Sequence, residues 1–229
     1  MKQNLANARA AGKFAILGNL FVFELMRATI GDENFLPALL EEPDWIRDFC
    51  QVYLDFYKRH YEIVFREAGT PDGFFLYEDF GFCNGLFCSP KTLNELIIPY
   101  EKALVGFFKD YGLTVILHSC GDVRKAVPLV IEAGFDCLQP MEAKAGCDVL
   151  ALARTYGNKL AHTRWARQPH GRVFPAVRLR ELKGWIVCQR VPFAFNLSEE
   201  AVYHQPHKLS LPRPALGAIR SGSPVAHTS

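Results

Sequence analysis

Two potential metal ligands follow one another closely near the middle of the chain. An apolar run at residues 113–117 leads into His118, Ser119 and Cys120. Because side chains in a strand alternate between its two faces, His118 and Cys120 project to one side and Ser119 to the other. Imidazole nitrogen and thiolate sulfur are common zinc ligands. The spacing therefore predicts half of a zinc site at the carboxyl end of a strand, where α/β proteins carry their chemistry.

Two carboxylates are the candidate catalytic residues. Asp79 ends a strand-like run and is expected at the same mouth, where it either binds substrate or a ligand-bound water, or caps a loop. Glu142 lies at the end of the strand-like run that follows the His118 strand, and it is expected to donate an oxygen to the metal or to orient His118. Glu78 directly precedes Asp79 and so faces the other side of its strand, which excludes an acid/base pair.

A zinc site needs at least one more ligand, and the spare cysteines are weaker candidates than Glu142. Cys83 and Cys147 are more simply explained as loop or core thiols, and Cys188 lies far along the chain in an unrelated setting. The alternative to a metal site is a purely structural role, in which His118 is a buried imidazole beside the inert thiol of Cys120.

Helical and strand-like patterns alternate from residue 32 onward, which indicates parallel βαβ units and an α/β fold. The helix at 43–68 carries a stripe of Trp45, Phe49, Tyr53, Phe56, His60 and Ile63, expected to be a packing face with His60 at an interface. The other helices are predicted at 90–112, at 122–134 with Asp122 as N-cap, and at 148–156. Strands are predicted at 73–79, 113–118 and 135–140, with one more starting at 159.

The pattern breaks after His162. Residues 161–229 hold ten Lys/Arg against three Asp/Glu, while residues 1–160 hold sixteen against twenty-one. We predict a partial barrel at 1–162 and an irregular basic tail, rich in Pro, Arg and His, at 163–229. That tail is either a natural extension that binds an acidic partner or the translation of a shifted frame or mis-joined gene, and we favour the second.

Composition excludes several classes. The net charge of +2 is too small to indicate nucleic acid or a membrane surface as partner. No apolar run is long enough to span a membrane, and the run at 14–23 lacks a signal-peptide cleavage site. Seven scattered cysteines are typical of a reduced, cytoplasmic protein.

Residues from about Asn19 to Leu160 resemble the uroporphyrinogen decarboxylase superfamily, and within it the corrinoid-dependent methyltransferases, which carry His-x-Cys on this strand. The segments that carry the resemblance are 23–36, Asp79-Phe80-Gly81, Ser89-Pro90 with Pro99-Tyr100, His118-Ser119-Cys120-Gly121, 134–136, and 138–142 with Ala145-Gly146.

The resemblance implies a (β/α)8 barrel and a zinc ion held by His118, Cys120 and a second cysteine from a later strand. It further implies that zinc activates a small thiol substrate, which takes a methyl group from a methyl-cobamide on a corrinoid carrier protein.

Two other functions stay open. One is decarboxylation of a tetrapyrrole without metal, the activity of uroporphyrinogen decarboxylase in porphyrin biosynthesis. The other is an inactive truncated copy, because a full barrel takes ~250 residues and the similar segment is shorter. By the same resemblance, we expect the family's first strand and substrate loop to be missing from this sequence.

Overall fold

A parallel sheet forms the centre of the protein. The computed structural model describes residues 1–157 and 159–162; the predicted basic tail at 163–229, with Cys188, lies outside them. Five strands pair in the order β1-β2-β5-β6-β7, every pair parallel. The α/β class predicted from the alternating patterns is therefore confirmed. The strands of this sheet are β1 Ile16–Leu20, β2 Gly73–Tyr77, β5 Thr114–His118, β6 Cys137–Gln139 and β7 Ala161–His162.

The helices lie between the strands along the chain. A short hairpin of β3 Gly81–Phe82 and β4 Gly85–Leu86 follows β2. The helices are α1 Lys2–Ala10, α2 Val22–Ile30, α3 Asp32–Glu41, α4 Pro43–Ala68, α5 Pro90–Leu96, α6 Ile98–Asp110, α7 Val127–Ala133 and α8 Val149–Tyr156, with a 3₁₀ turn, η1, at Ala143–Ala145.

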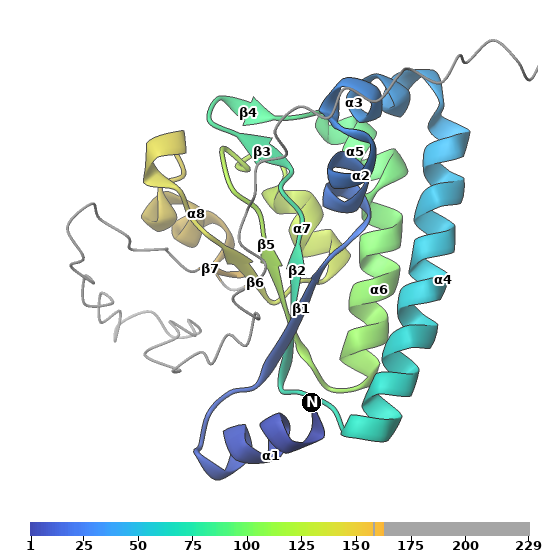
Figure 1. Cartoon of the computed structure of the whole chain (residues 1–229). Helices are drawn as coiled ribbons and strands as arrows, with labels where there is room; N and C mark the ends of the chain where they lie inside the picture. Colours follow the sequence, from blue (N-terminus) through green and yellow to red (C-terminus); the bar gives the residue numbers. More distant parts are fainter. Residues whose placement is uncertain (158, 163–229) are drawn as a thin grey trace, which may run out of the picture. The chain divides into compact units, whose positions relative to one another are not determined.

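The core lies between the sheet and the two longest helices, α4 and α6, which run side by side (Figure 1). Phe74 of β2 stacks on Phe108 of α6, with ring centroids 4.0 Å apart, and Tyr61 of α4 meets both rings edge-on. Burial of such aromatic side chains is the main stabilising contribution in a core of this kind. These contacts fix α4 and α6 on the sheet and so position the strands that carry the candidate site.

The face of α4 that packs on the sheet is not the one the aromatic stripe predicted. The buried positions are Ile46, Cys50, Leu54, Tyr57, Tyr61 and Phe65. Trp45, Phe56 and Ile63 are instead 44%, 58% and 48% exposed. The helix has two apolar stripes, and aromatic content favoured the wrong one, because burial depends on where the sheet lies and not on side-chain size.

Two predicted helix boundaries are also wrong. The helix expected at 90–112 is two helices that meet at Ile97, and Pro99, which has no N–H to donate, lies in the first turn of α6. Asp122 does not cap α7, which begins at Val127 after Ala126. The Asp122 carboxylate accepts hydrogen bonds from Arg124 instead.

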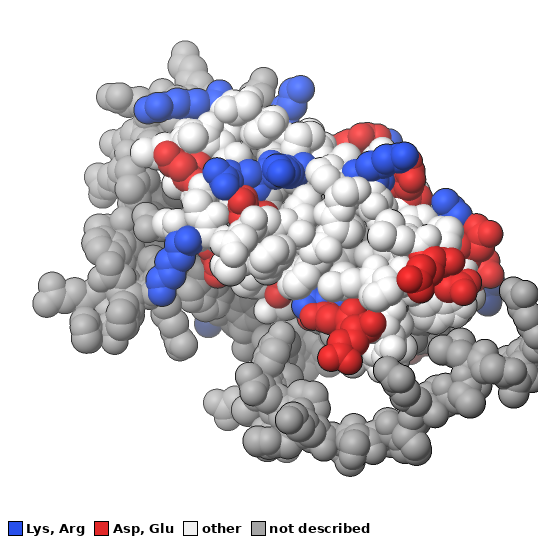
Figure 2. All heavy atoms as spheres, turned by 90° about the horizontal axis from the view of Figure 1, so that it is seen from above, with Lys and Arg blue, Asp and Glu red and all other residues white. Residues whose placement is uncertain are grey.

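The segment before residue 32 contributes more structure than its pattern indicated. The apolar run at 14–23 supplies the edge strand β1 and the start of α2. Within the described residues, no helix is both long and apolar enough to cross a membrane. In Figure 2, basic and acidic side chains form small groups among uncharged surface on the face shown.

Candidate metal centre

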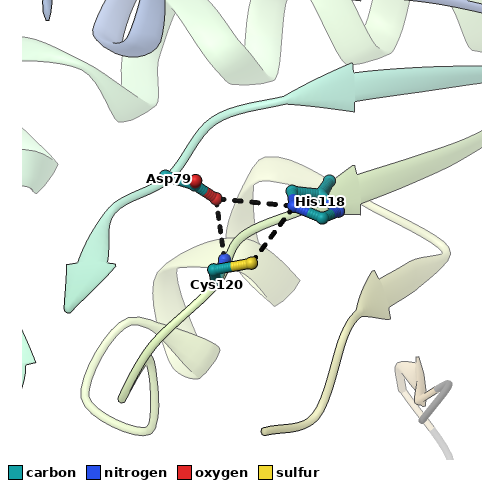
Figure 3. A group of neighbouring side chains, drawn as sticks. All are labelled: Asp79, His118 and Cys120. Carbon is teal, nitrogen blue, oxygen red and sulfur yellow. Dashed lines mark hydrogen bonds and ion pairs between the residues drawn. The ribbon is translucent and has the colours of Figure 1, made fainter. Parts of the chain in front are cut away.

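Three potential ligands converge where β2 and β5 end (Figure 3). Asp79 follows β2, His118 is the last residue of β5, and Cys120 comes two residues later. Cys120 Sγ lies 3.3 Å from His118 Nε2, and that nitrogen lies 3.6 Å from Asp79 Oδ1. One ligand atom from each residue lies within 4.8 Å of the other two. The structure thus brings the predicted His118 and Cys120 together and adds Asp79 to them.

Backbone hydrogen bonds hold the loops that carry these ligands. Cys120 N–H donates to Asp79 Oδ1 at 2.7 Å, and Glu78 N–H donates to His118 O at 2.9 Å. Ser119 is fully buried, and its hydroxyl accepts a hydrogen bond from Phe80 N–H. Each loop therefore fixes the other, and the ligands are placed by backbone geometry.

Close backbone packing explains a glycine at the turn after Cys120. Gly121 has a φ of +82°, and a Cβ there would lie 2.6 Å from Phe82 N. A larger residue would be strained both by that φ and by the contact. Gly121 thus lets the loop after β5 approach the hairpin strand β3.

Gln139 sets the orientation and tautomer of the His118 ring. Leu20, Tyr77, His118 and Gln139 occupy one row across the sheet, because they are register partners on adjacent strands. The two atoms Gln139 Oε1 and His118 Nδ1 are 2.6 Å apart. An amide oxygen only accepts, so Nδ1 carries the hydrogen and Nε2 keeps its lone pair facing Cys120 and Asp79. Tyr77 stacks on the imidazole with centroids 3.9 Å apart.

Burial sets the protonation of the ligands when no cation is bound. It lowers the pKa of His118, an effect that the Asp79 charge partly offsets. Burial, together with the charges of Asp79 and Glu142, raises the pKa of Cys120 to about 12. At neutral pH the imidazole of His118 is therefore neutral and the thiol of Cys120 is protonated. A bound cation would favour the thiolate form of Cys120 instead.

The remaining predicted residues lie beside the three ligands. Glu142 accepts a hydrogen bond from Gly121 N–H at 3.0 Å and acts on Cys120 electrostatically, but it is not one of the three converging residues. Cys147 is buried and its thiol donates to Gly121 O, while Cys83 is exposed on the hairpin. The structure thus places Asp79, and not Glu142 or a described cysteine, where a third ligand is needed.

Arg27 of α2 forms an ionic group with two carboxylates and contacts the backbone of Asp79. Arg27 pairs with Glu24 and Asp32 at 2.9 and 2.7 Å and donates to the backbone oxygen of Asp79. Its guanidinium also lies 4.0 Å from the centroid of the Phe87 ring. Because its charge is already matched by two carboxylates, Arg27 leaves the Asp79 side chain available to a cation.

The donor set fits zinc. One nitrogen, one sulfur and one carboxylate oxygen are all ligands that zinc accepts, and a site with three protein ligands keeps a position open for substrate. The fold and the site together define a class: an α/β protein with a candidate metal centre at the carboxyl ends of adjacent parallel strands. No family model, curated protein or solved structure matches the chain.

Gln139 and Tyr77 are the site residues that the sequence analysis missed. Gln139 is the last residue before Pro140 in the strand predicted at 135–140. Its position opposite His118 depends on the register between β5 and β6, which neither segment shows alone. The available signal was its position at the last residue before Pro140, at the same edge as His118.

Proposed function

We propose that this protein is a zinc-dependent methyltransferase that moves a methyl group from a methyl-corrinoid to a thiol acceptor. The observation that carries the proposal is the convergence of His118 Nε2, Cys120 Sγ and Asp79 Oδ1, with the other ring nitrogen of His118 occupied by Gln139. Such outer hydrogen bonds are the usual support of a metal-binding histidine. The family resemblance supplies the type of reaction.

The strand order supports a further proposal about the fold. Each new strand of the sheet is added beside the previous one on the same side, in the order β1-β2-β5-β6-β7. Sequential parallel strands with helical crossovers are the arrangement of a (β/α)8 barrel, in which active sites lie at the carboxyl ends of the strands. We therefore propose that the described residues form part of such a barrel, open between β1 and β7.

Each residue of the site has a distinct task in this proposal. Asp79, His118 and Cys120 hold the zinc ion, and Gln139 keeps Nε2 of His118 unprotonated. Glu142 fixes the turn at Gly121 through its backbone N–H. Bound zinc would lower the pKa of the acceptor thiol so that a thiolate is present at neutral pH.

The co-substrates and setting follow from the same reaction. A corrinoid carrier protein would present the methyl-cobamide at the mouth formed by the loops after β2 and β5, and a small thiol would enter there. A reduced, cytoplasmic environment suits this role, since the structure has free thiols at Cys50, Cys83, Cys88, Cys120 and Cys147.

Zinc content and methyl transfer test the proposal together. The purified full chain is expected to hold one zinc ion and to demethylate methylcobalamin in the presence of a small thiol. His118→Ala and Cys120→Ala should lose both properties, while Cys83→Ala, which removes an exposed cysteine outside the cluster, should keep both. A folded wild-type protein that takes up no zinc would refute the metal site, and one that binds zinc without methyl transfer would refute the reaction alone.

A further inference from the structure

The outer face of α4 carries an apolar stripe that no described residue covers. We call it the outer stripe. Its first four residues are spaced four, three and four positions apart. Arg59 then interrupts the stripe, which resumes at Ile63. Its members are Trp45, Phe49, Val52, Phe56 and Ile63. All but Phe49 are between 44% and 64% exposed.

Aromatic contacts join the outer stripe to its neighbours. Trp45 and Phe49 are 6.1 Å apart between centroids, Phe49 stacks on Tyr53 at 4.5 Å, and Phe56 stacks on His60. The stripe spans nineteen positions, from 45 to 63, which makes it about 27 Å long. An exposed apolar surface of this length marks an interaction site more often than isolated surface residues do.

The 3–4 spacing indicates what fits the outer stripe. Apolar residues that alternate three and four apart form the seam along which two helices pack with their axes nearly aligned. α4 is a 26-residue helix whose other apolar face is already buried on the sheet. The complementary surface is therefore a second long helix with a matching seam.

The charges beside the stripe favour one direction of pairing. Residues 41–55 hold five acidic side chains against Arg47 alone, and residues 56–68 hold three basic ones against Glu62 and Glu67. Two copies of α4 side by side in the same direction would bring the acidic halves together. Antiparallel copies place the acidic half of each helix against the basic half of the other. A two-fold axis perpendicular to the helices produces this antiparallel arrangement.

We propose that a second copy of this chain packs antiparallel against the outer stripe of α4, so that the protein is a two-fold symmetric dimer. With the axis at the level of Leu54, Val52 lies opposite Phe56 of the second copy and Trp45 opposite Ile63. The same register sets Glu42 against Arg66. This pairing buries the apolar stripe on both copies and places the net acidic residues 41–55 of each copy against the net basic residues 56–68 of the other.

Mass measurement by sedimentation or light scattering tests the dimer on the full chain. The wild type is expected at twice the monomer mass of 25.8 kDa. Val52→Glu with Phe56→Glu should give a monomer with unchanged circular dichroism. Leu150→Glu, a matched change at an exposed apolar residue of α8, should remain a dimer.

A charge exchange tests the antiparallel register and does not depend on the apolar variants folding. Glu42→Arg or Arg66→Glu alone should weaken the dimer at least tenfold, and the two together should restore it. A wild type that stays monomeric overturns the proposal. If Phe56 is then protected in hydroxyl-radical footprinting, residues 163–229 of the same chain or another protein are the occupant. A dimer that is indifferent to every stripe variant overturns it equally.

Discussion

The amide oxygen of Gln139 lies 2.6 Å from Nδ1 of His118, on the side of the imidazole away from Cys120 and Asp79. The two residues are register partners on neighbouring parallel strands, so the sheet itself holds the contact. Because the amide oxygen can only accept, the ring hydrogen is committed to Nδ1 and the opposite nitrogen is free to bind a metal. The availability of the His118 ligand thus depends on a residue that binds no metal itself.

Replacing Gln139 should weaken zinc binding without unfolding the protein. Gln139→Ala removes the acceptor for Nδ1–H, so the ring loses its preferred orientation and tautomer. We expect the affinity for zinc to fall about 10–100-fold. Competition with a chelator measures this, and Gln139→Asn, which keeps an amide on a shorter side chain, serves as comparison. Equal affinities for wild type and Gln139→Ala would show that His118 needs no such partner.

The charge of Asp79 should matter beyond its hydrogen bond. Asp79→Asn keeps an oxygen that can accept from Cys120 N–H but loses the negative charge, while Asp79→Ala loses both. We expect Asp79→Asn to lower zinc affinity by ~10-fold or more with little change in thermal stability. Asp79→Ala should lower both, because the loop after β5 loses its anchor. If Asp79→Asn binds zinc as tightly as the wild type, Asp79 caps the loop and is not a ligand.

The turn after Cys120 should tolerate no side chain. Gly121→Ala introduces a Cβ 2.6 Å from Phe82 N at a φ of +82°, so the loop must shift or strain. We expect a loss of about 1–3 kcal/mol in the free energy of unfolding, together with weaker zinc binding.

Gly106 offers the matched control. It lies within α6, where an added Cβ meets nothing within 4 Å. Gly106→Ala should therefore stabilise the protein by about 0.5–1 kcal/mol and leave zinc binding unchanged. Denaturant unfolding of both variants measures the difference, and similar losses from the two substitutions would contradict the steric explanation.

The buried carboxyl of Glu101 should make stability fall as pH rises. Glu101 is fully buried on α6, and neither of its carboxylate oxygens has a hydrogen-bond partner among the residues that the structure describes. Burial raises the pKa of Glu101 to about 8, and burial together with the Glu101 charge raises the pKa of Glu78. The folded state therefore holds protons that the unfolded state releases above about pH 4.5. The free energy of unfolding should decrease from there to about pH 8 and level off above it.

Substitution isolates the contribution of Glu101. Glu101→Gln stays neutral at every pH, so its stability should fall less steeply between about pH 5 and about pH 9, and at the upper end it should exceed wild type by a few kcal/mol. Denaturant unfolding across this range gives both curves. Glu132→Gln, at an exposed position on α7, should follow the wild-type curve. Parallel curves for Glu101→Gln and wild type would mean that Glu101 is ionised and accommodated in the core.

Local sequence was enough to predict the elements around the site. The alternating patterns predicted β2, β5, β6 and the helices between them, since periodicity and the Gly134 and Gly157 ends are properties of short segments. The side-chain alternation at His118 and Cys120 likewise depends only on a local strand. Those two potential ligands were therefore identifiable from the residues alone.

The contacts between segments could not be predicted in this way. Asp79 is 39 residues before His118, and Gln139 is 21 after it; the pairing of β2, β5 and β6 brings all three together. The face of α4 that is buried was predicted wrongly for the same reason, because the helix has two apolar stripes and only the position of the sheet selects between them.

The sequence by itself determined most of the strands and helices from residue 43 onward and placed His118 and Cys120 together as potential ligands. Tertiary structure alone decided that Asp79 lies within reach of both, the tautomer of His118 and the exposed stripe of α4. The physical reason is that secondary structure and side-chain alternation depend on near neighbours along the chain. Register, burial and electrostatics depend on residues that only folding brings within reach.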